Sequence, residues 1–334
     1  MNDKIKEEIY KCSKCGLCKS VCPIYLATKN EMYSPRGRYI ILNNLSEQNK
    51  KPSKEFYKNL DFCLNCNLCK DFCPSNIDSA KIFTQLKYKS NIFYIKLFFI
   101  FLNNGLLNFF KKYNPKKDTT KEKILYFEGC YNNYIDCSDR NATIKILENL
   151  GYEVKVISKC CGYPFICNGD ENKAKKNEAE ILSIYNKEIK HIVCSCDSCY
   201  ETLLKYQNEE FTSKLIRLDE LLQRKNAKLN TNENVLYFKP LIRKEKTYFL
   251  NEIKTINQKG ICSLMENFFL IKNKKKKKEI INSMNIASLQ LENKTIITTC
   301  QLSKYGLKEI IKEKNITTKV LSFSEYINLL TKNE

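Results

Sequence analysis

Residues 11–23, KCSKCGLCKSVCP, and residues 61–74, DFCLNCNLCKDFCP, decide the fold of the first part of this chain. Both contain the spacing C-x2-C-x2-C-x3-C-P. Three thiolates at a three-residue period can wrap one face of a cubane iron–sulfur cluster, and the cysteine before the proline leaves that loop for the other cluster. The sequence therefore predicts two [4Fe–4S] clusters, one bound by Cys12, Cys15, Cys18 and Cys73 and the other by Cys63, Cys66, Cys69 and Cys22.

The chain has 18 cysteines in 334 residues, and two other uses of so many cysteines fit the sequence less well. The first residues, MNDKIKEEIY, are charged and lack the apolar stretch of a secretory signal, which argues against a disulfide framework. Structural zinc sites use separated C-x2-C pairs, and a triplet followed by a fourth cysteine and a proline does not fit them. The single histidine, His191, excludes His-rich metal sites and most His-based catalysis. We expect no catalytic side chain.

Five further cysteines form a second pattern in which each follows a predicted strand. The strands are expected at 124–127, 152–157 and 191–196, and the cysteines are Cys130, Cys160, Cys161, Cys196 and Cys199. Because the carboxyl ends of parallel strands meet at one edge of a sheet, these thiols should converge there. An adjacent pair suits a polynuclear centre, and five thiolates exceed the four that tetrahedral zinc requires. Three more cysteines fall outside the pattern and are typical of small buried hydrophobic residues, although Cys194 could compete with Cys196: Cys137, Cys167 and Cys194.

The organisation of the chain follows from these patterns. We expect an α-helical ferredoxin domain with two clusters, an apolar connecting helix or linker, a cysteine-rich α/β domain with the complete five-cysteine set, and a degenerate second copy of it, at residues 1–90, 91–120, 121–230 and 231–334. Helices should begin after Ser34-Pro35 and after Ser53. Strand and helix alternation from residue 121 favours a parallel sheet. Four short motifs recur in the same order in the two halves, which indicates duplicated domains. LYF at 125 matches LYF at 236, Cys161 matches Cys262, IVCSC matches IITTC, and KLIRLDELLQR matches KVLSFSEYINL.

Composition excludes several function classes. No G-x-G-x-x-G or G-x-x-x-x-G-K-[ST] run is present, so a flavin or nicotinamide should sit on a partner. The net charge is +20, but only six of 57 basic residues are Arg, a composition that does not indicate nucleic-acid binding. The lysine run 274–278 is expected to be a solvated loop. The apolar segment 92–113 is interrupted by Lys96 and by 103–105, too often to span a bilayer. It is expected to be a buried helix, with an interfacial helix as the alternative.

These motifs together resemble a known family. KCSKCGLCKSVCPIY, YSPRGRYI and DFCLNCNLCKDFCPS look like the amino-terminal domain of the glycolate oxidase iron–sulfur subunit, which is related to a subunit of the anaerobic glycerol-3-phosphate dehydrogenase and to heterodisulfide reductase. The C…CCG…C-x2-C set, with 29 residues between Cys130 and Cys160 and 34 between Cys161 and Cys196, looks like its cysteine-rich domain. By resemblance, this set would hold a non-cubane [4Fe–4S] cluster in addition to the two cubanes.

The resemblance implies a function in electron transfer. The chain would take electrons from an FAD-containing dehydrogenase subunit that oxidises a 2-hydroxy acid, such as glycolate or lactate, and pass them toward quinone or another membrane acceptor. A cytoplasmic location follows, with peripheral association with the inner face of the membrane as a further expectation. The alternative is a disulfide reductase with the five-cysteine centre as its catalytic site. Arg36 and Arg38 also match the family; they would adjust a cluster's surroundings or dock an acidic partner, or else be two solvated cations on a capped helix.

The second copy departs from the family pattern. Leu241 stands where the first cysteine would be, Ile261 precedes Cys262 in place of a cysteine pair, and Ser303 replaces the last cysteine after Cys300. Since two thiolates of five cannot hold such a cluster, we expect this half to be structural.

Overall fold

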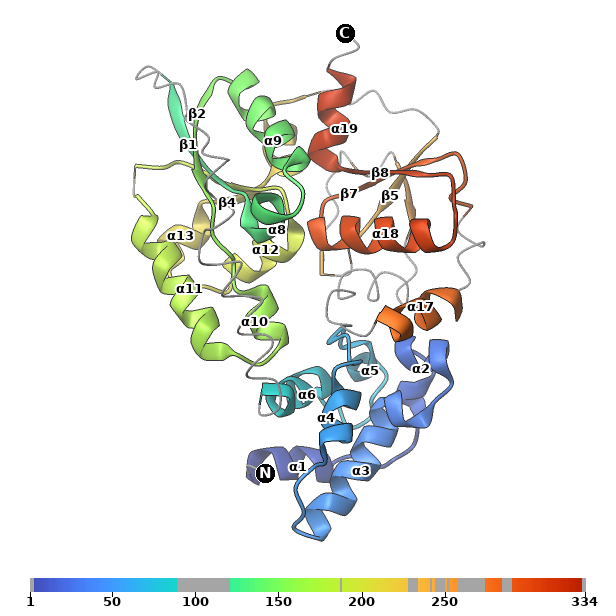
Figure 1. The fold of residues 1–334 in the computed structure, drawn as a ribbon. Helices are drawn as coiled ribbons and strands as arrows, with labels where there is room; N and C mark the ends of the chain where they lie inside the picture. Colours follow the sequence, from blue (N-terminus) through green and yellow to red (C-terminus); the bar gives the residue numbers. More distant parts are fainter. Residues whose placement is uncertain are drawn as a thin grey trace.

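The computed structural model describes residues 3–88, 121–186, 188–227, 234–240, 242–243, 250, 253–256, 274–283 and 290–331. Three units are visible in Figure 1, a helical unit at the bottom and two α/β units side by side above it. The predicted apolar helix at 92–113 lies outside the described residues. So do Leu241, Ile261 and Cys262. No helix among the described residues is long and apolar enough to cross a membrane.

Residues 3–88 form short helices joined by loops, with no strand in this range, as the sequence predicts. The elements are α1 (Asp3–Tyr10), the 3-10 turn η1 (Leu17–Lys19), α2 (Pro23–Thr28), η2 (Glu31–Tyr33), α3 (Pro35–Glu47), α4 (Lys54–Leu60), α5 (Leu68–Asp71) and α6 (Ser79–Tyr88). The predicted caps are confirmed. Ser34 accepts a hydrogen bond from the Gly37 amide at the start of α3, with Pro35 in the first turn, and Ser53 accepts one from Phe56 at the start of α4.

The first α/β unit contains a four-stranded parallel sheet, which confirms the parallel arrangement expected from the sequence. Its strands are β1 (Glu122–Phe127), β2 (Tyr152–Ile157), β3 (Ile192–Cys194) and β4 (Leu215–Arg217), in the spatial order β2-β1-β3-β4. The helices are α8 (Gly129–Tyr134), α9 (Ser138–Asn149), α10 (Tyr163–Cys167), α11 (Glu171–Ile184), α12 (Asp197–Leu203), α13 (Glu209–Ser213) and α14 (Leu218–Arg224). The chain reverses direction across the sheet between β1 and β3, where ligands bind in open α/β folds.

The second α/β unit has the same strand order. Its strands are β5 (Val235–Phe238), β6 (Lys254–Ile256), β7 (Thr295–Thr298) and β8 (Lys319–Ser322), in the order β6-β5-β7-β8 and all parallel. The described helices are α17 (Lys274–Ser283), α18 (Gln301–Glu313) and α19 (Phe323–Leu330). The prediction of a loop at 274–278 is wrong. Lysine is a good helix former, and the run leads into Ile280 and Ile281, which are buried and anchor α17.

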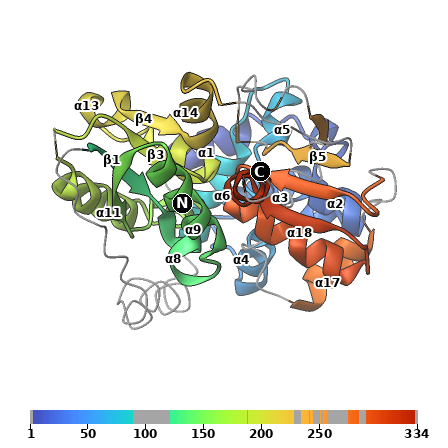
Figure 2. The same cartoon turned by 90° about the horizontal axis from the view of Figure 1, so that it is seen from above.

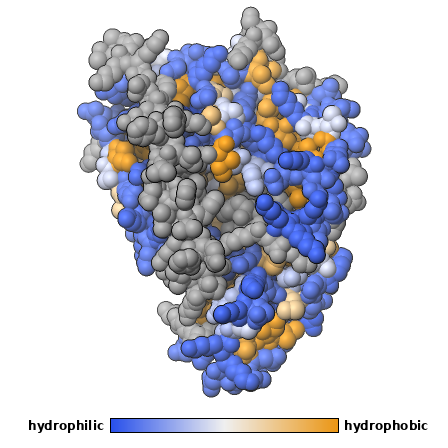
Figure 3. Space-filling view, viewed as in Figure 1, coloured by the Kyte–Doolittle hydropathy of each residue, from blue (hydrophilic) through white to orange (hydrophobic). Residues whose placement is uncertain are grey.

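The two α/β units share one hydrophobic core, and Figure 2 shows them side by side from above. Ile124 and Val193 of the first sheet belong to the same buried cluster as Tyr237 and Ile297 of the second. The helical unit packs on the second α/β unit through Ile24 and Leu64, which join the core formed by residues of β5, β7 and α18. In the view of Figure 3 most exposed residues are hydrophilic, and apolar residues gather in small patches, one of them on the helical unit.

Candidate iron–sulfur sites

The two cysteine loops of the helical unit take the same backbone path. The residues immediately before and after the middle cysteine adopt the left-handed conformation in both loops: Lys14 and Gly16 around Cys15, with φ of 61° and 87°, and Asn65 and Asn67 around Cys66, with φ of 53° and 58°. Glycine and asparagine tolerate this conformation best. Each loop therefore turns tightly around its cysteines.

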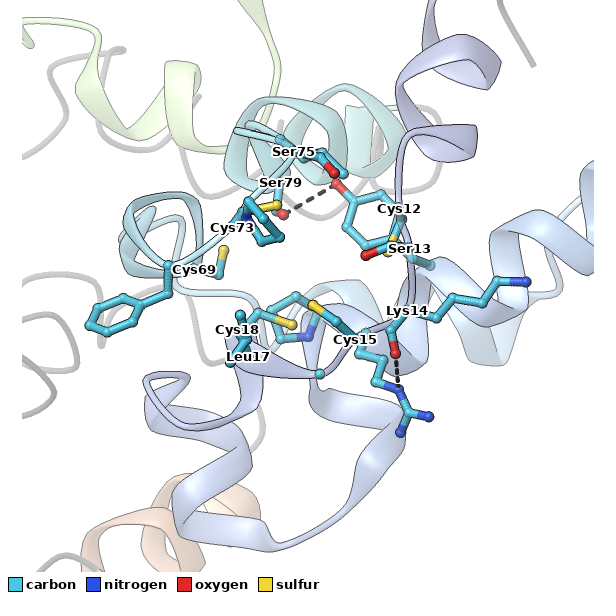
Figure 4. Close-up of a pocket in the computed structure, with 17 residues that line it drawn as sticks. Cys12, Ser13, Lys14, Cys15, Leu17, Cys18, Cys69, Cys73, Ser75 and Ser79 are labelled. Atoms are coloured by element: carbon cyan, nitrogen blue, oxygen red, sulfur yellow. Dashed lines mark hydrogen bonds between the residues drawn. The ribbon is translucent and has the colours of Figure 1, made fainter.

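The first cavity of the helical unit is lined by cysteines from both runs. Its space of about 400 Å³ includes its open mouth, and Figure 4 shows the side chains of Cys12, Cys15 and Cys18 grouped around it with Cys73. Cys73 belongs to the second run, so this cavity combines three cysteines of one loop with the fourth of the other. Cys69 also lines it, because the two sites are adjacent.

The second cavity repeats this arrangement with the runs exchanged. It has about 390 Å³ of space and is lined by Cys63, Cys66, Cys69 and, from the first run, Cys22. Cys69 lines both cavities, and the buried Tyr39, whose hydroxyl donates a 3.2 Å hydrogen bond to Ser79, lines the first. The cavities therefore lie next to each other inside one small domain.

Backbone amides surround the sulfur atoms of these loops. The amide of Leu17 and the hydroxyl of Ser13 lower the pKa of the exposed Cys15 thiol. Burial raises the pKa of Cys18 to about 11 and also raises that of Cys22, while the amides of Arg36 and Tyr25 respectively oppose the increase. Hydrogen bonds to sulfur and burial are the features that set the potential of an iron–sulfur cluster.

Arg36 and Arg38 have different surroundings. The Arg36 side chain is partly exposed; its Nε donates a 2.9 Å hydrogen bond to the Lys14 carbonyl and its guanidinium pairs with Glu31 at 3.2 Å. It therefore stabilises the backbone of the first cysteine loop. Arg38 is 1% exposed and donates two 3.0 Å hydrogen bonds to Asn59, and its charge lowers the pKa of Cys22. The interpretation of Arg38 as a solvated cation is wrong, because α3 buries it against the second loop.

The cysteines of the first α/β unit meet at the carboxyl edge of the sheet, at the reversal between β1 and β3. Their side chains pack in one series, called the sulfur series below: Cys130 packs against the buried cluster of Cys160, and the adjacent Cys161 belongs to one buried cluster with Cys199, Cys196 and Cys300. The predicted five-cysteine set is thus brought together. Cys300 comes from the second α/β unit and is the one member that the sequence interpretation left out of the site.

The loops that carry these cysteines are firmly held. Asn177 donates a 3.1 Å hydrogen bond to the Cys160 carbonyl, and the Tyr206 hydroxyl donates one of the same length to the Cys161 carbonyl. Gly129 has a φ of +72°, and a Cβ atom on it would lie 2.9 Å from the Cys199 sulfur. A side chain at this position would therefore enter the space of the thiols.

The cysteines outside the pattern are separate from this series. Cys194 is buried at the end of β3, and burial is the main cause of its raised pKa. Cys137 precedes α9 and is partly exposed. Cys167 ends α10, and its carbonyl accepts a 2.7 Å hydrogen bond from the side-chain amide of Asn65 in the second cysteine loop. It therefore links the helical unit to the first α/β unit.

The donor sets suit iron–sulfur chemistry. Two adjacent cavities each have four or more cysteines in their lining, and polynuclear iron takes thiolate ligands of this kind. Over the described ranges no three His, Cys, Asp or Glu side chains are placed to chelate a single metal ion.

Two family models match this chain. A 4Fe-4S dicluster domain matches residues 8–77 and a cysteine-rich domain matches residues 124–204. The first match contains both cysteine loops of the helical unit, and the second contains the five cysteines of the first α/β unit.

Several known proteins are similar to this chain. A probable glycolate oxidase iron–sulfur subunit of Bacillus subtilis is 19% identical, over 64% of this chain and 66% of its own length. A subunit of the dihydromethanophenazine:CoB–CoM heterodisulfide reductase of Methanosarcina mazei is 23% identical, over 58% of this chain and 56% of its own length. A subunit of the anaerobic glycerol-3-phosphate dehydrogenase of Escherichia coli is 40% identical over 17% of this chain and 15% of its own length. The relatives that match more than half of this chain are themselves covered over 37% to 66% of their length. The predicted resemblance is confirmed.

Proposed function

We propose that this iron–sulfur protein, related to the oxidoreductase subunits named above, carries electrons between a dehydrogenase and a second acceptor. The proposal assigns one [4Fe–4S] cubane to Cys12, Cys15, Cys18 and Cys73, a second to Cys63, Cys66, Cys69 and Cys22, and a non-cubane [4Fe–4S] centre to the cysteine series of the first α/β unit. When bound, these clusters supply one-electron redox chemistry. The protein groups hold them, exclude water and set their potentials through amides and burial.

The observation that supports this function best is the serial arrangement of the three sites. The first cavity is adjacent to the second, and the loop of the second is hydrogen-bonded through Asn65 to Cys167, at the end of the helix that follows Cys160 and Cys161. Lys87 is buried at the same junction, where its ammonium donates a 2.8 Å hydrogen bond to the Cys63 carbonyl. A route through packed protein therefore connects each site to the next.

The surface around the first cavity suits a docking partner. Cys15 is exposed, and the apolar side chains of Leu17 and Phe72, 53% and 47% exposed, also line this cavity. Apolar side chains at the mouth of a redox site favour contact with another protein. In the proposal an FAD-containing dehydrogenase subunit, which oxidises a 2-hydroxy acid of the glycolate or lactate type, docks here. Electrons then leave the cysteine-rich centre for quinone or another membrane acceptor.

The ancestry of the second α/β unit is part of the same proposal. Its sheet has the strand order of the first, and Tyr237 bonds Thr299 at 3.0 Å as Tyr126 bonds Ser195 at 3.0 Å. We infer that it is a degenerate copy of the cysteine-rich domain, which fits the motif repeats in the sequence.

The test is anaerobic purification with metal analysis. Three clusters predict about 12 iron and about 12 acid-labile sulfide per chain, with electron paramagnetic resonance (EPR) signals of reduced cubanes. Reduction by a 2-hydroxy acid should require an FAD-containing dehydrogenase subunit, and a quinone analogue should reoxidise the clusters. Stoichiometric zinc without sulfide would refute the proposal.

A disulfide reductase is the second candidate, and the line of adjacent thiols at the cysteine-rich site favours it. The reduced chain alone should then cleave small disulfides without a flavoprotein. An inactive, fully loaded chain would exclude this alternative.

A further inference from the structure

The end of β7 in the second α/β unit has the same local geometry as the end of β3 in the first. Cys300 precedes α18 with φ −129° and ψ 124°, and Cys196 precedes α12 with φ −126° and ψ 118°. The two strand ends are joined directly, because the Asp197 amide donates a 2.9 Å hydrogen bond to the Thr299 carbonyl. Two cysteines at equivalent positions of two sheets are therefore brought face to face.

The Cys300 side chain faces the sulfur series and not a purely apolar core. It is fully buried, it belongs to the same buried cluster as Cys161, Cys196 and Cys199, and its Sγ is 3.1 Å from the Ser198 Oγ. Hydrogen bonds to the sulfurs are among the features that set the potential of an iron–sulfur cluster.

Polar atoms at the start of α18 point to a bound group at the same place. Gln301 is 1% exposed and Ser303 is fully buried, and neither the Gln301 amide nor the Ser303 hydroxyl has a hydrogen-bond partner among the described residues. A buried polar group of this kind costs about 1–3 kcal/mol unless something pairs with it. Buried polar groups almost always have a partner, and a bound centre or a water next to it would supply one here.

We propose that Cys300 supplies a sixth thiolate to the iron–sulfur centre of the cysteine-rich site, so that both α/β units hold this centre. The inference rests on the proposed function, since it assumes that Cys130, Cys160, Cys161, Cys196 and Cys199 bind iron. Thiolates are the ligands that iron–sulfur clusters take, and Cys300 extends the series of sulfur contacts by one. Ser198 stabilises the sulfur, and Gln301 and Ser303 pair with the bound centre. The second α/β unit then supplies a ligand of this centre in addition to packing against the first unit.

Two alanine variants of buried cysteines test this in the full chain, purified anaerobically. Cys300→Ala should lose or alter the cysteine-rich centre, with iron and sulfide falling by up to about a third and the EPR signals of the two cubanes unchanged. Cys194→Ala is the matched control, because Cys194 is equally buried in the same core but lies outside the sulfur series. Its iron content and Mössbauer spectrum should match the parent.

A serine variant guards against a folding defect. Cys300→Ser keeps the volume and the contact with Ser198, so if Cys300→Ala does not accumulate, a changed Mössbauer spectrum of Cys300→Ser supports the proposal. A Cys300 variant with the parent's iron content and spectrum would overturn the sixth thiolate and leave the proposed function intact. A parent chain with only about eight irons would overturn both, since the cysteine-rich centre itself would then be missing.

Discussion

The side-chain amide of Asn65 donates a 2.7 Å hydrogen bond to the carbonyl oxygen of Cys167, 102 residues away. Asn65 lies between two cysteines of the second cavity, and Cys167 ends the helix that begins beside the cysteine pair. This bond therefore joins the two kinds of candidate cluster site.

Asn65→Gly should weaken this junction without changing the loop. Glycine adopts the left-handed backbone of Asn65 readily, so only the side-chain amide is lost. A hydrogen bond of this kind contributes about 1 kcal/mol, which corresponds to roughly a fivefold larger population of the opened junction. Hydrogen exchange of the α10 amides should accelerate accordingly, and electron transfer from the cubanes to the cysteine-rich centre should slow. Asn67→Gly, in the same loop and backbone conformation, is the control and should leave exchange in α10 unchanged.

Gly129→Ala should damage the cysteine-rich centre selectively. The added Cβ would meet the Cys199 sulfur at 2.9 Å, so the thiols could not keep their arrangement. We expect iron to fall by up to about a third while the cubane EPR signals remain. Gly151→Ala is matched in backbone strain, with φ +88° against +72°, but its Cβ would have nothing within 4 Å. Equal loss of iron in both variants would mean that strain, and not crowding of the sulfur, causes the effect.

Lys304→Gln should loosen the packing between the two α/β units. Lys304 is fully buried and pairs with Asp136 at 3.0 Å and with Glu325 at 2.7 Å, so its removal takes the cation from Glu325 and leaves Asp136 paired with the exposed Lys308. Breaking a buried ion pair costs about 3–5 kcal/mol, and we expect the lower end, measured by urea unfolding at pH 7. Lys308→Gln, which removes an exposed partner of the same Asp136, should cost less than about 1 kcal/mol.

The cost of Lys304→Gln should shrink as the pH falls. Burial alone would raise the pKa of Glu325, but the hydrogen bond and charge of Lys304 lower it below the ordinary value of 4.5. A lowered pKa in the folded state gives stability that is complete above pH 4.5 and is lost as the pH falls through the folded value. The difference in unfolding free energy between parent and variant should therefore be smaller at pH 4 than at pH 7. A constant difference would contradict the assignment of this ion pair.

Cys66→Ser should remove one cubane and weaken the helical unit. Metal-binding energy is folding energy in small metal domains, so loss of one cluster should also reduce protection of α4 and α6 in hydrogen exchange. Iron should fall by about a third, with one reduced EPR signal lost. Cys137→Ser, outside every predicted site, should retain all the iron and the exchange pattern of the parent.

Local spacing was sufficient to predict most of the fold. The strand at 152–157 and the helix starts after Ser34 and Ser53 were predicted because each depends on a few adjacent residues. The lysine run 274–278 was misassigned as a loop because the residues that anchor the helix α17, Ile280 and Ile281, lie beyond the run. The local pattern of the run does not show that distant residues bury these two side chains.

The candidate sites divide in the same way. The sequence predicted that Cys22 lies with the second loop and Cys73 with the first, because the fourth cysteine of this motif binds the cluster of the other loop. The approach of Cys300 to Cys196 could not be predicted, because it depends on how two separately coded sheets meet. One signal was present: IITTC aligns with IVCSC, which places Cys300 at the position of Cys196.

Ile24 and Leu64, one beside each cysteine loop, are anchored in the apolar interior of the second α/β unit. Mutations in that interior should affect stability mainly through the change in hydrophobic volume, whether or not they change its cysteines. In the proposed function this unit cannot simply be deleted during evolution, because the cysteine loops packed against it would lose their alignment with the cysteine-rich site. The ligand-type side chains of this unit can change during evolution while its fold is conserved.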